Sequence, residues 1–255
     1  MTPKTLYEDN DLLVLEKPAG MIVNKADTAK GLVTLQDFVN ENYPITSVPK
    51  LPKEEYIVDG YNKYDEFVSR SGIVHRLDKE TSGVILVAKN VETFINLQEQ
   101  FKSGKVKKIY TTLLHGKLEN ETGEVNEPIG RLPWNRMRFG VFPQGRAAHT
   151  IYKVLSFKKH ADTKDQEVLS FVEVYPQTGR THQIRVHFQF IKHPVYGDEL
   201  YAGRKTGRDD RKKLNRHFLH ASKISLLSPT TNVPVTYESP LPEELDKFFE
   251  TLVDA

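Results

Sequence analysis

A carboxylate, Asp78, stands in the segment HRLDKETSG between two apolar stretches of the chain. Arg76 precedes it by two residues and a Thr-Ser-Gly turn follows it, so the acid is expected on a loop held by rigid strands, where functional residues are common. Such an acid would act in its ionised form, as a carboxylate. On these residues alone a simpler interpretation is stronger, in which Asp78 and Thr81 only form the hydrogen bond of a turn.

A second segment, PQTGRTHQIRVH, places Arg180 directly after a glycine turn and at the mouth of an expected helix. Its guanidinium could reach across to a carboxylate, and a bidentate arginine keeps an aspartate ionised and oriented. The alternative is a surface salt bridge, which is common and contributes little. His182 and His187 suggest a metal site, but their spacing splits them across the faces of a helix, so no metal is predicted.

Short apolar runs bounded by proline, glycine and polar turns predict the framework around these segments. Strands are expected at 11–18, 84–89, 107–116, 148–157, 167–176, 221–229 and 234–239. Helices are expected over 31–39, after a cap at Asn90, after a cap at Thr181, and from Pro242. The run 84–89 is apolar almost throughout, which is typical of a strand buried on both faces. Strands dominate and no strict βαβ repeat occurs, so the sequence predicts an α+β fold with a mostly antiparallel sheet.

The chain has 255 residues and a net charge of only +2, but its basic residues are unevenly distributed. Seven of them lie between Arg204 and Arg216, against two acidic residues, so this stretch is either a phosphate contact or a solvated loop. Segments 44–70 and 201–216 are expected to be surface insertions or loops. The absence of cysteine excludes disulfides, thiolate zinc sites and cysteine nucleophiles. Without a signal peptide or a membrane-spanning run, we expect a soluble cytoplasmic protein with no membrane partner.

The motif HRLDKETSGVILVAK resembles the signature of the RluA family of pseudouridine synthases. Other motifs follow in the family's order: VLEKPAGMIVNK, KKIYTTLLHG, TGRTHQIRVH with HPVYGDELYAG, and LHASKISLLSP. The resemblance covers about Tyr7 to Leu245. It implies one catalytic domain over 1–255, with a large, mostly antiparallel (mixed), curved sheet flanked by helices and loops. It also implies that no S4-type RNA-binding domain precedes that domain.

The resemblance implies that the chain isomerises uridine to pseudouridine in folded RNA. The reaction breaks the N1 glycosidic bond, turns the uracil and joins its C5 to the same sugar carbon, so no cofactor is expected. Asp78 would be the catalytic carboxylate, either attacking the sugar or assisting proton removal there, with Arg180 orienting it. Arg76 would enter the space that the flipped base vacates, and Tyr110 would lie against the uracil and take the C5 proton. Ile184 would complete the apolar wall of the pocket.

Further contacts are expected from other residues. Substrate-binding roles are expected for Lys17, His75 and Thr81. Phosphate contacts are expected from a basic set, namely Lys107, Lys108, Arg185, Arg204, Lys205, Arg211, Lys212 and Lys213. The partner would be a structured ribosomal or transfer RNA, bound by a monomer without a metal ion.

Two other functions are open. A glycosidase or nucleoside hydrolase also uses carboxylates at a sugar carbon, and Glu80 could supply the second acid that such enzymes need, although no independent motif supports the pair. A non-catalytic RNA-binding protein could retain the same scaffold. The joint presence of Asp78, Tyr110 and Arg180 argues against it.

Overall fold

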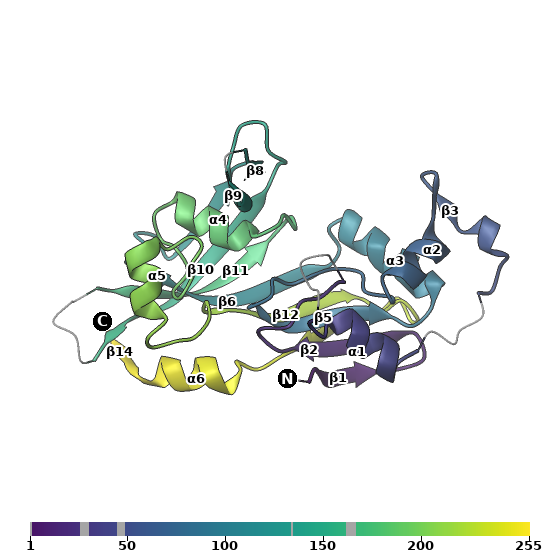
Figure 1. Ribbon diagram of the computed structural model, residues 1–255, viewed down its shortest axis with the longest axis horizontal. Helices are drawn as coiled ribbons and strands as arrows, with labels where there is room; N and C mark the ends of the chain where they lie inside the picture. The colour runs from purple at the N-terminus through teal and green to yellow at the C-terminus, as the bar shows by residue number, and fades with distance from the viewer. Residues whose placement is uncertain (1, 26–30, 45–48, 134, 162–166) are drawn as a thin grey trace. The chain divides into compact units, whose positions relative to one another are not determined.

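The computed structural model describes residues 2–25, 31–44, 49–133, 135–161 and 167–255, which form two compact units (Figure 1). Unit 1 comprises Met1–Lys107 and Lys223–Ser239, and unit 2 comprises Lys108–Ser222 and Pro240–Ala255. Neither unit is continuous in sequence. No helix in the described ranges is long and apolar enough to cross a membrane.

Unit 1 is a small sheet with helices on both faces. Its strands are β1 (Lys4–Glu8), β2 (Leu12–Lys17), β3 (Ile57–Val58), β4 (Tyr61–Asn62), β5 (Ser82–Ala88) and β13 (Pro234–Glu238). Its helices are α1 (Leu35–Asn42), α2 (Lys63–Ser69) and α3 (Val91–Lys102), with a 3-10 turn at Lys53–Glu55. β2 pairs antiparallel with both β1 and β5, and β5 neighbours β12 (Leu219–Leu227), which pairs antiparallel with β13.

Strand β5 is buried along its whole length, as its apolar sequence predicted. Val84 and Leu86 pack into the cluster that contains α2 and α3, whereas Ile85 and Val87 pack into the cluster that contains α1. The alternation follows from the two-residue period of a strand, which sends successive side chains to opposite faces. The loop that precedes β5 is therefore attached to a strand fixed from both sides.

Helix α1 begins later than predicted. Thr34 accepts a hydrogen bond from the amide of Asp37 at 3.1 Å, and the Asp37 carboxylate accepts one from the amide of Thr34 at 3.0 Å. This capping box satisfies amides that the first turn would otherwise leave unpaired, so the helix starts at Leu35 and not at Gly31. Leu32, inside the range predicted for the helix, is 51% exposed.

The prediction that segment 44–70 is a surface insertion fails at two residues. Phe67 on α2 is fully buried and Tyr56 is 5% exposed, and both belong to the core beneath α3. The other described residues of the segment are exposed or half-buried. Residues 45–48 of the segment lie outside the described residues.

Unit 2 is built on a second set of antiparallel strands. Its strands are β6 (Lys107–His115, from its second residue), β7 (Thr122–Asn126), β8 (Ile129–Leu132), β9 (Asn135–Val141), β10 (His149–His160), β11 (Leu169–Pro176) and β14 (Leu252–Asp254). Its helices are α4 (Gln183–Phe190), α5 (Arg204–Asp210) and α6 (Glu243–Glu250). β11 lies between β6 and β10, and β8 pairs with β9 as a separate hairpin. The predicted β10–β11 hairpin is confirmed, although its turn at 162–165 lies outside the described residues.

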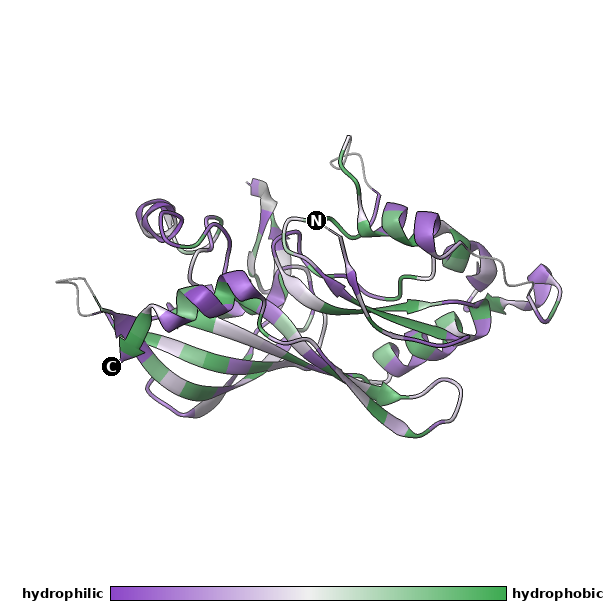
Figure 2. Ribbon diagram, turned by 90° about the horizontal axis from the view of Figure 1, so that it is seen from below, coloured by the Kyte–Doolittle hydropathy of each residue, from purple (hydrophilic) through white to green (hydrophobic). Residues whose placement is uncertain are grey.

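Helices cover both faces of the unit 2 strands. Leu114 and Val172 pack into the cluster that holds α4, whereas Leu113 and Leu169 pack into the cluster that holds α6. Figure 2 shows the resulting alternation of apolar and polar residues along the strands. Pro242 is the residue before α6 and not its first residue. With helices segregated from mostly antiparallel strands in both units, the predicted α+β fold class is confirmed.

Candidate active site

Asp78 lies in unit 1, on the loop that leads into β5. Its neighbour Leu77 is 5% exposed and anchors the loop in the core, while Asp78 is half-buried. The amide of Thr81 donates to the carbonyl oxygen of Asp78 at 3.1 Å. The turn bond of the simpler interpretation is thus present, and it accepts at the backbone of Asp78. The loop holds the acid on a fixed backbone.

Lys17 supports this loop from beneath. Its side chain is fully buried, and its ammonium donates to the carbonyl oxygens of Pro18 at 2.9 Å, Met21 at 2.9 Å and Lys79 at 3.1 Å. The amide of Gly20 donates to the same Lys79 oxygen at 2.8 Å. An ammonium has three donors, and three carbonyls receive them. The prediction that Lys17 binds substrate is therefore wrong: it joins the Lys-Pro turn to the Asp78 loop.

Three other predicted residues flank Asp78. His75 accepts a hydrogen bond at Nε2 from the amide of Leu86 at 2.9 Å and stacks on Phe101 with 4.9 Å between ring centroids, so it fastens the loop to β5 and α3. Thr81 is 1% exposed, which contradicts a direct contact with substrate. Arg76 is exposed, and its role of entering the RNA stays a prediction.

Tyr110 and Ile184 lie together in unit 2. Tyr110 on β6 faces Val174 on β11 in register, and it packs against the cluster that contains both Val174 and Ile184. Tyr110 is half-buried, while Ile184 is 6% exposed. Both residues therefore belong to one apolar cluster, and their role in binding uracil stays a prediction.

Arg180 occupies the turn between β11 and α4 and is half-buried. Its Nε donates to the carbonyl oxygen of Ala147 at 2.9 Å, and its amide donates to the side chain of Gln183 at 2.9 Å. Burial and the neighbouring Arg146 cation lower the pKa of Arg180 from its ordinary value. Two guanidinium groups so close together favour the approach of an anion.

Helix α4 begins at Gln183, two residues after the predicted cap. Thr181 is not the cap residue. His182 stands at the cap position with a left-handed φ of 56°, and the side-chain oxygen of Gln183 accepts a hydrogen bond from the amide of Arg180. Lys108, predicted to contact phosphate, donates to the carbonyl oxygen of Thr178 at 3.4 Å and so lies against the same turn. The described residues contain no group of three or more His, Asp or Glu that could hold a metal ion.

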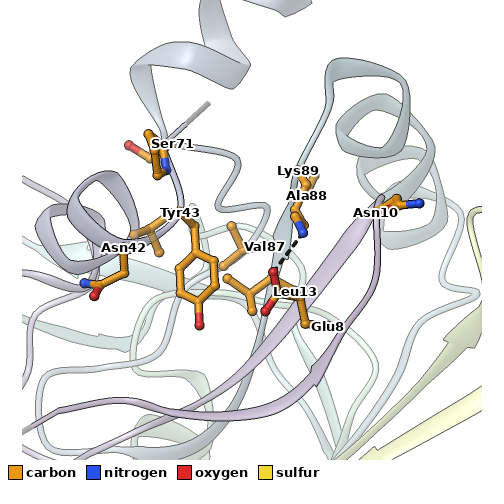
Figure 3. A pocket seen from close by; sticks show the side chains of 11 residues that line it. Glu8, Asn10, Leu13, Asn42, Tyr43, Ser71, Val87, Ala88 and Lys89 are labelled. Carbon is orange, nitrogen blue, oxygen red and sulfur yellow. Dashed lines mark hydrogen bonds and ion pairs between the residues drawn. The ribbon is translucent and has the colours of Figure 1, made fainter. Parts of the chain in front are cut away.

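A cavity of about 410 Å³ opens in unit 1, away from these residues. Figure 3 shows the Glu8–Lys89 ion pair and Tyr43 at its wall. Its lining consists of Glu8, Asn10, Leu13, Val39, Asn42, Tyr43, Pro44, Ser71, Val87, Ala88 and Lys89. No predicted site residue lines it.

Comparison with known proteins identifies the family. A family model described as RNA pseudouridylate synthase matches residues 11–190. The chain belongs to the RNA pseudouridylate synthase family. The predicted family is therefore confirmed, and the enzyme class that goes with it is an isomerase acting on RNA.

Named relatives agree with this assignment. The ribosomal large subunit pseudouridine synthase D of Nitrosomonas europaea is 35% identical over 254 residues, which cover 98% of this chain and 65% of the relative. The uncharacterized RNA pseudouridine synthase YhcT of Bacillus subtilis is 34% identical, with 96% and 71% covered. The chain thus spans about two thirds of the length of these relatives.

Solved structures show the same fold. Human RNA Pseudouridylate Synthase Domain Containing 1 has a TM-score of 0.69 and 27% identity, covering 97% of this chain and 87% of the human one. Human RNA Pseudouridylate Synthase Domain Containing 4 has a TM-score of 0.66 at 22% identity, over 98% and 93% of the two chains. The pseudouridylate synthase fold is confirmed over nearly the whole chain.

Arg185 of this family member is not a surface phosphate contact. It is 7% exposed, and its Nε and Nη2 donate to the two carboxylate oxygens of Asp198 at 2.7 and 2.9 Å. Its guanidinium also lies 5.0 Å from the centroid of the Tyr201 ring. The phosphate prediction for Arg185 is wrong, because the bidentate pair fixes α4 to the turn at 198–201.

The basic run between Arg204 and Arg216 is only partly a charged surface. Arg216 is 3% exposed and donates to the carbonyl oxygens of His217 and Leu219. Arg211 is half-buried and donates to backbone oxygens of Gly197 and Asn215, and its phosphate contact stays a prediction. The exposed bases of the run are Arg204, Lys205, Arg208, Lys212 and Lys213. Helix α5 within the predicted surface loop also buries Asp210.

Sequence reasoning missed a second basic segment, Pro128–His149, which contains the β8–β9 hairpin and projects beyond α4 (Figure 1). It carries Arg131, Arg136, Arg138 and Arg146 and contains no Asp or Glu. The guanidinium of Arg131 lies 4.9 Å from the centroid of the Phe139 ring, and Arg146 is exposed. The segment has fewer basic residues than the run after Gly203, so the number of bases does not distinguish it. Its lack of acidic residues is the signal that could have identified it.

Proposed function

We propose that this chain is an RNA pseudouridine synthase in which Asp78 is the catalytic carboxylate. The observation that carries the proposal is the rigidly held HRLD loop of a pseudouridylate synthase family member, with Asp78 half-buried beside the exposed Arg76. Lys17 and His75 hold that loop from two sides.

The proposed reaction is a rearrangement within one nucleotide. The N1 glycosidic bond breaks, uracil turns, a bond forms between C5 and the same sugar carbon, C5 loses its proton and N1 gains one. Asp78 either attacks the sugar or assists proton removal there. Because the atoms balance without an oxidant or a co-reactant, the chemistry requires no redox cofactor.

The remaining residues would receive and orient the base. The base must leave its stack at a cost of a few kcal/mol. Arg76 would fill the space it leaves, and Tyr110 with Ile184 would hold the uracil against an apolar wall. Asp78 belongs to unit 1 and Arg180 to unit 2, so the pairing of this arginine with the aspartate stays a prediction.

The RNA would be bound through exposed cations. The segment Pro128–His149 and the exposed bases after Gly203 are the two concentrations of positive charge that support this proposal, with Lys107 as a further exposed base. Relatives from Nitrosomonas europaea and Blochmanniella floridana are named for the ribosomal large subunit, so its RNA is the first substrate to test. We further propose that both units act as one catalytic domain, as a monomer in the cytoplasm, with no metal.

Tritium release from RNA labelled at uridine C5 tests the function. The wild-type protein should release tritium without releasing free uracil, a hydrolase would free the base, and a binding protein would do neither. Asp78→Asn should abolish turnover and leave RNA affinity within about threefold, because the amide keeps the volume and loses the charge. Asp65→Asn, at an exposed carboxylate on α2, is the matched control and should retain activity. Isomerisation retained in Asp78→Asn would refute the assignment.

A further inference from the structure

Gln183, which is 5% exposed, holds the turn that carries Arg180. Its side-chain oxygen accepts from the amide of Arg180 at 2.9 Å and from the hydroxyl of Thr178 at 2.7 Å. Its side-chain nitrogen donates to the carbonyl oxygen of His149 and to the hydroxyl of Thr150, both at 2.9 Å. Both acceptor positions and both donors of this amide are thus in use.

The hydrogen bonds continue from Gln183 to His187, which is fully buried. His187 lies 2.9 Å through Nδ1 from the Thr150 hydroxyl and 3.0 Å through Nε2 from the carbonyl oxygen of Glu127. A carbonyl only accepts, so Nε2 carries the hydrogen and Nδ1 accepts from Thr150. Burial lowers the pKa of His187, which keeps the ring in the neutral form that this chain of bonds needs.

These bonds join α4 to both ends of the basic segment Pro128–His149. Gln183 and His187 are four residues apart and therefore share one face of the helix. His187 holds Glu127, directly before the segment, and Gln183 holds His149, at its end. Arg180 also bonds the carbonyl oxygen of Ala147 inside the segment.

A second link ties the middle of the hairpin to the beginning of α4. The hydroxyl of Tyr201 accepts from the amide of Phe139 on β9 at 3.0 Å and lies 2.9 Å from Nδ1 of His182. The hairpin is thus held at its two ends and along β9 by one helix, and that helix begins three residues after Arg180.

We propose that Gln183 and His187 are positioning residues that hold the basic hairpin and Arg180 in one register. An RNA gripped by the hairpin is then placed at a set distance from the arginine, so the network determines which nucleotide is presented for reaction. The inference rests on the proposed function for the roles of the hairpin and Arg180, whereas the network itself consists of contacts within unit 2.

The test uses the full chain with Gln183→Met, which keeps the length of the side chain and removes its four bonds. Ser170→Ala is the matched control, because it removes a buried hydroxyl that bonds Leu118 and Gly116 elsewhere in unit 2. Gln183→Met should lower kcat at least tenfold with RNA affinity within threefold, while Ser170→Ala should leave both unchanged. His187→Phe should act like Gln183→Met, and His187→Gln, which keeps a donor, should recover part of the loss.

Two further measurements separate positioning from a general loss of stability. In an Arg180→Lys background, Gln183→Met should lower kcat by less than twofold. If Gln183 acts through Arg180, the effects of the two substitutions are not additive. Hydrogen exchange should increase both around Arg180 and at 127–131 and 147–150 in Gln183→Met. Multiplicative effects with Arg180→Lys, or faster exchange confined to the Arg180 turn, would overturn the proposal. If the wild-type protein released no tritium, the proposed function would fail, and the exchange data would still decide whether Gln183 links the two segments.

Discussion

Replacing Arg185 by methionine separates a buried structural ion pair from an RNA contact. Asp198 is fully buried, and the two hydrogen bonds from Arg185 compensate its charge, together with the amides of Leu200 and Tyr201 at 3.0 and 3.2 Å. Of these donors, removing the arginine leaves the buried carboxylate only the two neutral backbone amides. Loss of one partner of a buried pair costs about 3–5 kcal/mol. In a chain of this size, that loss corresponds to a fall in Tm of roughly 6–20 °C.

Urea unfolding and a salt titration of RNA binding measure the two consequences of Arg185→Met. The free energy of unfolding should fall by the amount above, while the slope of log affinity against log salt should stay unchanged, because no phosphate contact is lost. Exposed Arg146 is the matched control: Arg146→Met should leave stability within about 0.5 kcal/mol and reduce the salt slope by roughly 0.7. An unchanged stability with a reduced salt slope in Arg185→Met would refute the reasoning.

Two further predictions follow from the buried groups. Burial opposes protonation of His115, but its hydrogen bonds to the Asp210 and Glu167 carboxylates outweigh burial and raise the pKa of His115 to about 9. Because the folded pKa is raised, the contribution of His115 to the free energy of unfolding is complete below pH 6.5 and is lost as pH rises through about 9. Stability should therefore fall across this window, and His115→Gln should remove the pH dependence. Urea unfolding at several pH values would detect both effects. Phe67→Ala should lower the free energy of unfolding by about 3–5 kcal/mol. Tyr61→Ala, at a side chain 71% exposed, should change it by less than about 0.5 kcal/mol. Equal effects of the two substitutions in thermal unfolding would contradict the assignment of Phe67 to the core.

Local patterns predicted the elements that local physics decides. The apolar run of β5 gave a strand buried on both faces, and Asn90 caps α3, accepting from the amide of Thr93 at 2.8 Å, while the helix ends before Gly104 with a φ of 71°. The start of α4 was wrong because His182, with a left-handed φ of 56°, stands at the cap position that propensity gives to Thr181.

Long-range partners explain what the sequence could not predict about the site. Lys17 was predicted to bind substrate, but one of the three carbonyl oxygens that its ammonium bonds belongs to Lys79, 62 residues along the chain. Arg185 reads as a member of a basic motif, yet its partner Asp198 neutralises it from the next loop. The roles of residues held only by neighbours in sequence were predictable, and those set by distant carbonyls and carboxylates were not.

Strand β12 has a consequence for the order in which the chain can fold on the ribosome. Unit 1 consists of residues up to Lys107 and then from Lys223, so β5 acquires its neighbour β12 only after more than a hundred further residues have been made. At 5–20 residues per second this interval is roughly 6–20 s. During it, a strand of seven apolar or small residues has one edge without its final neighbour, the condition under which strands from different chains associate. The nascent protein is therefore most exposed to aggregation before translation passes β12, and slower synthesis of unit 2 would lengthen that exposure.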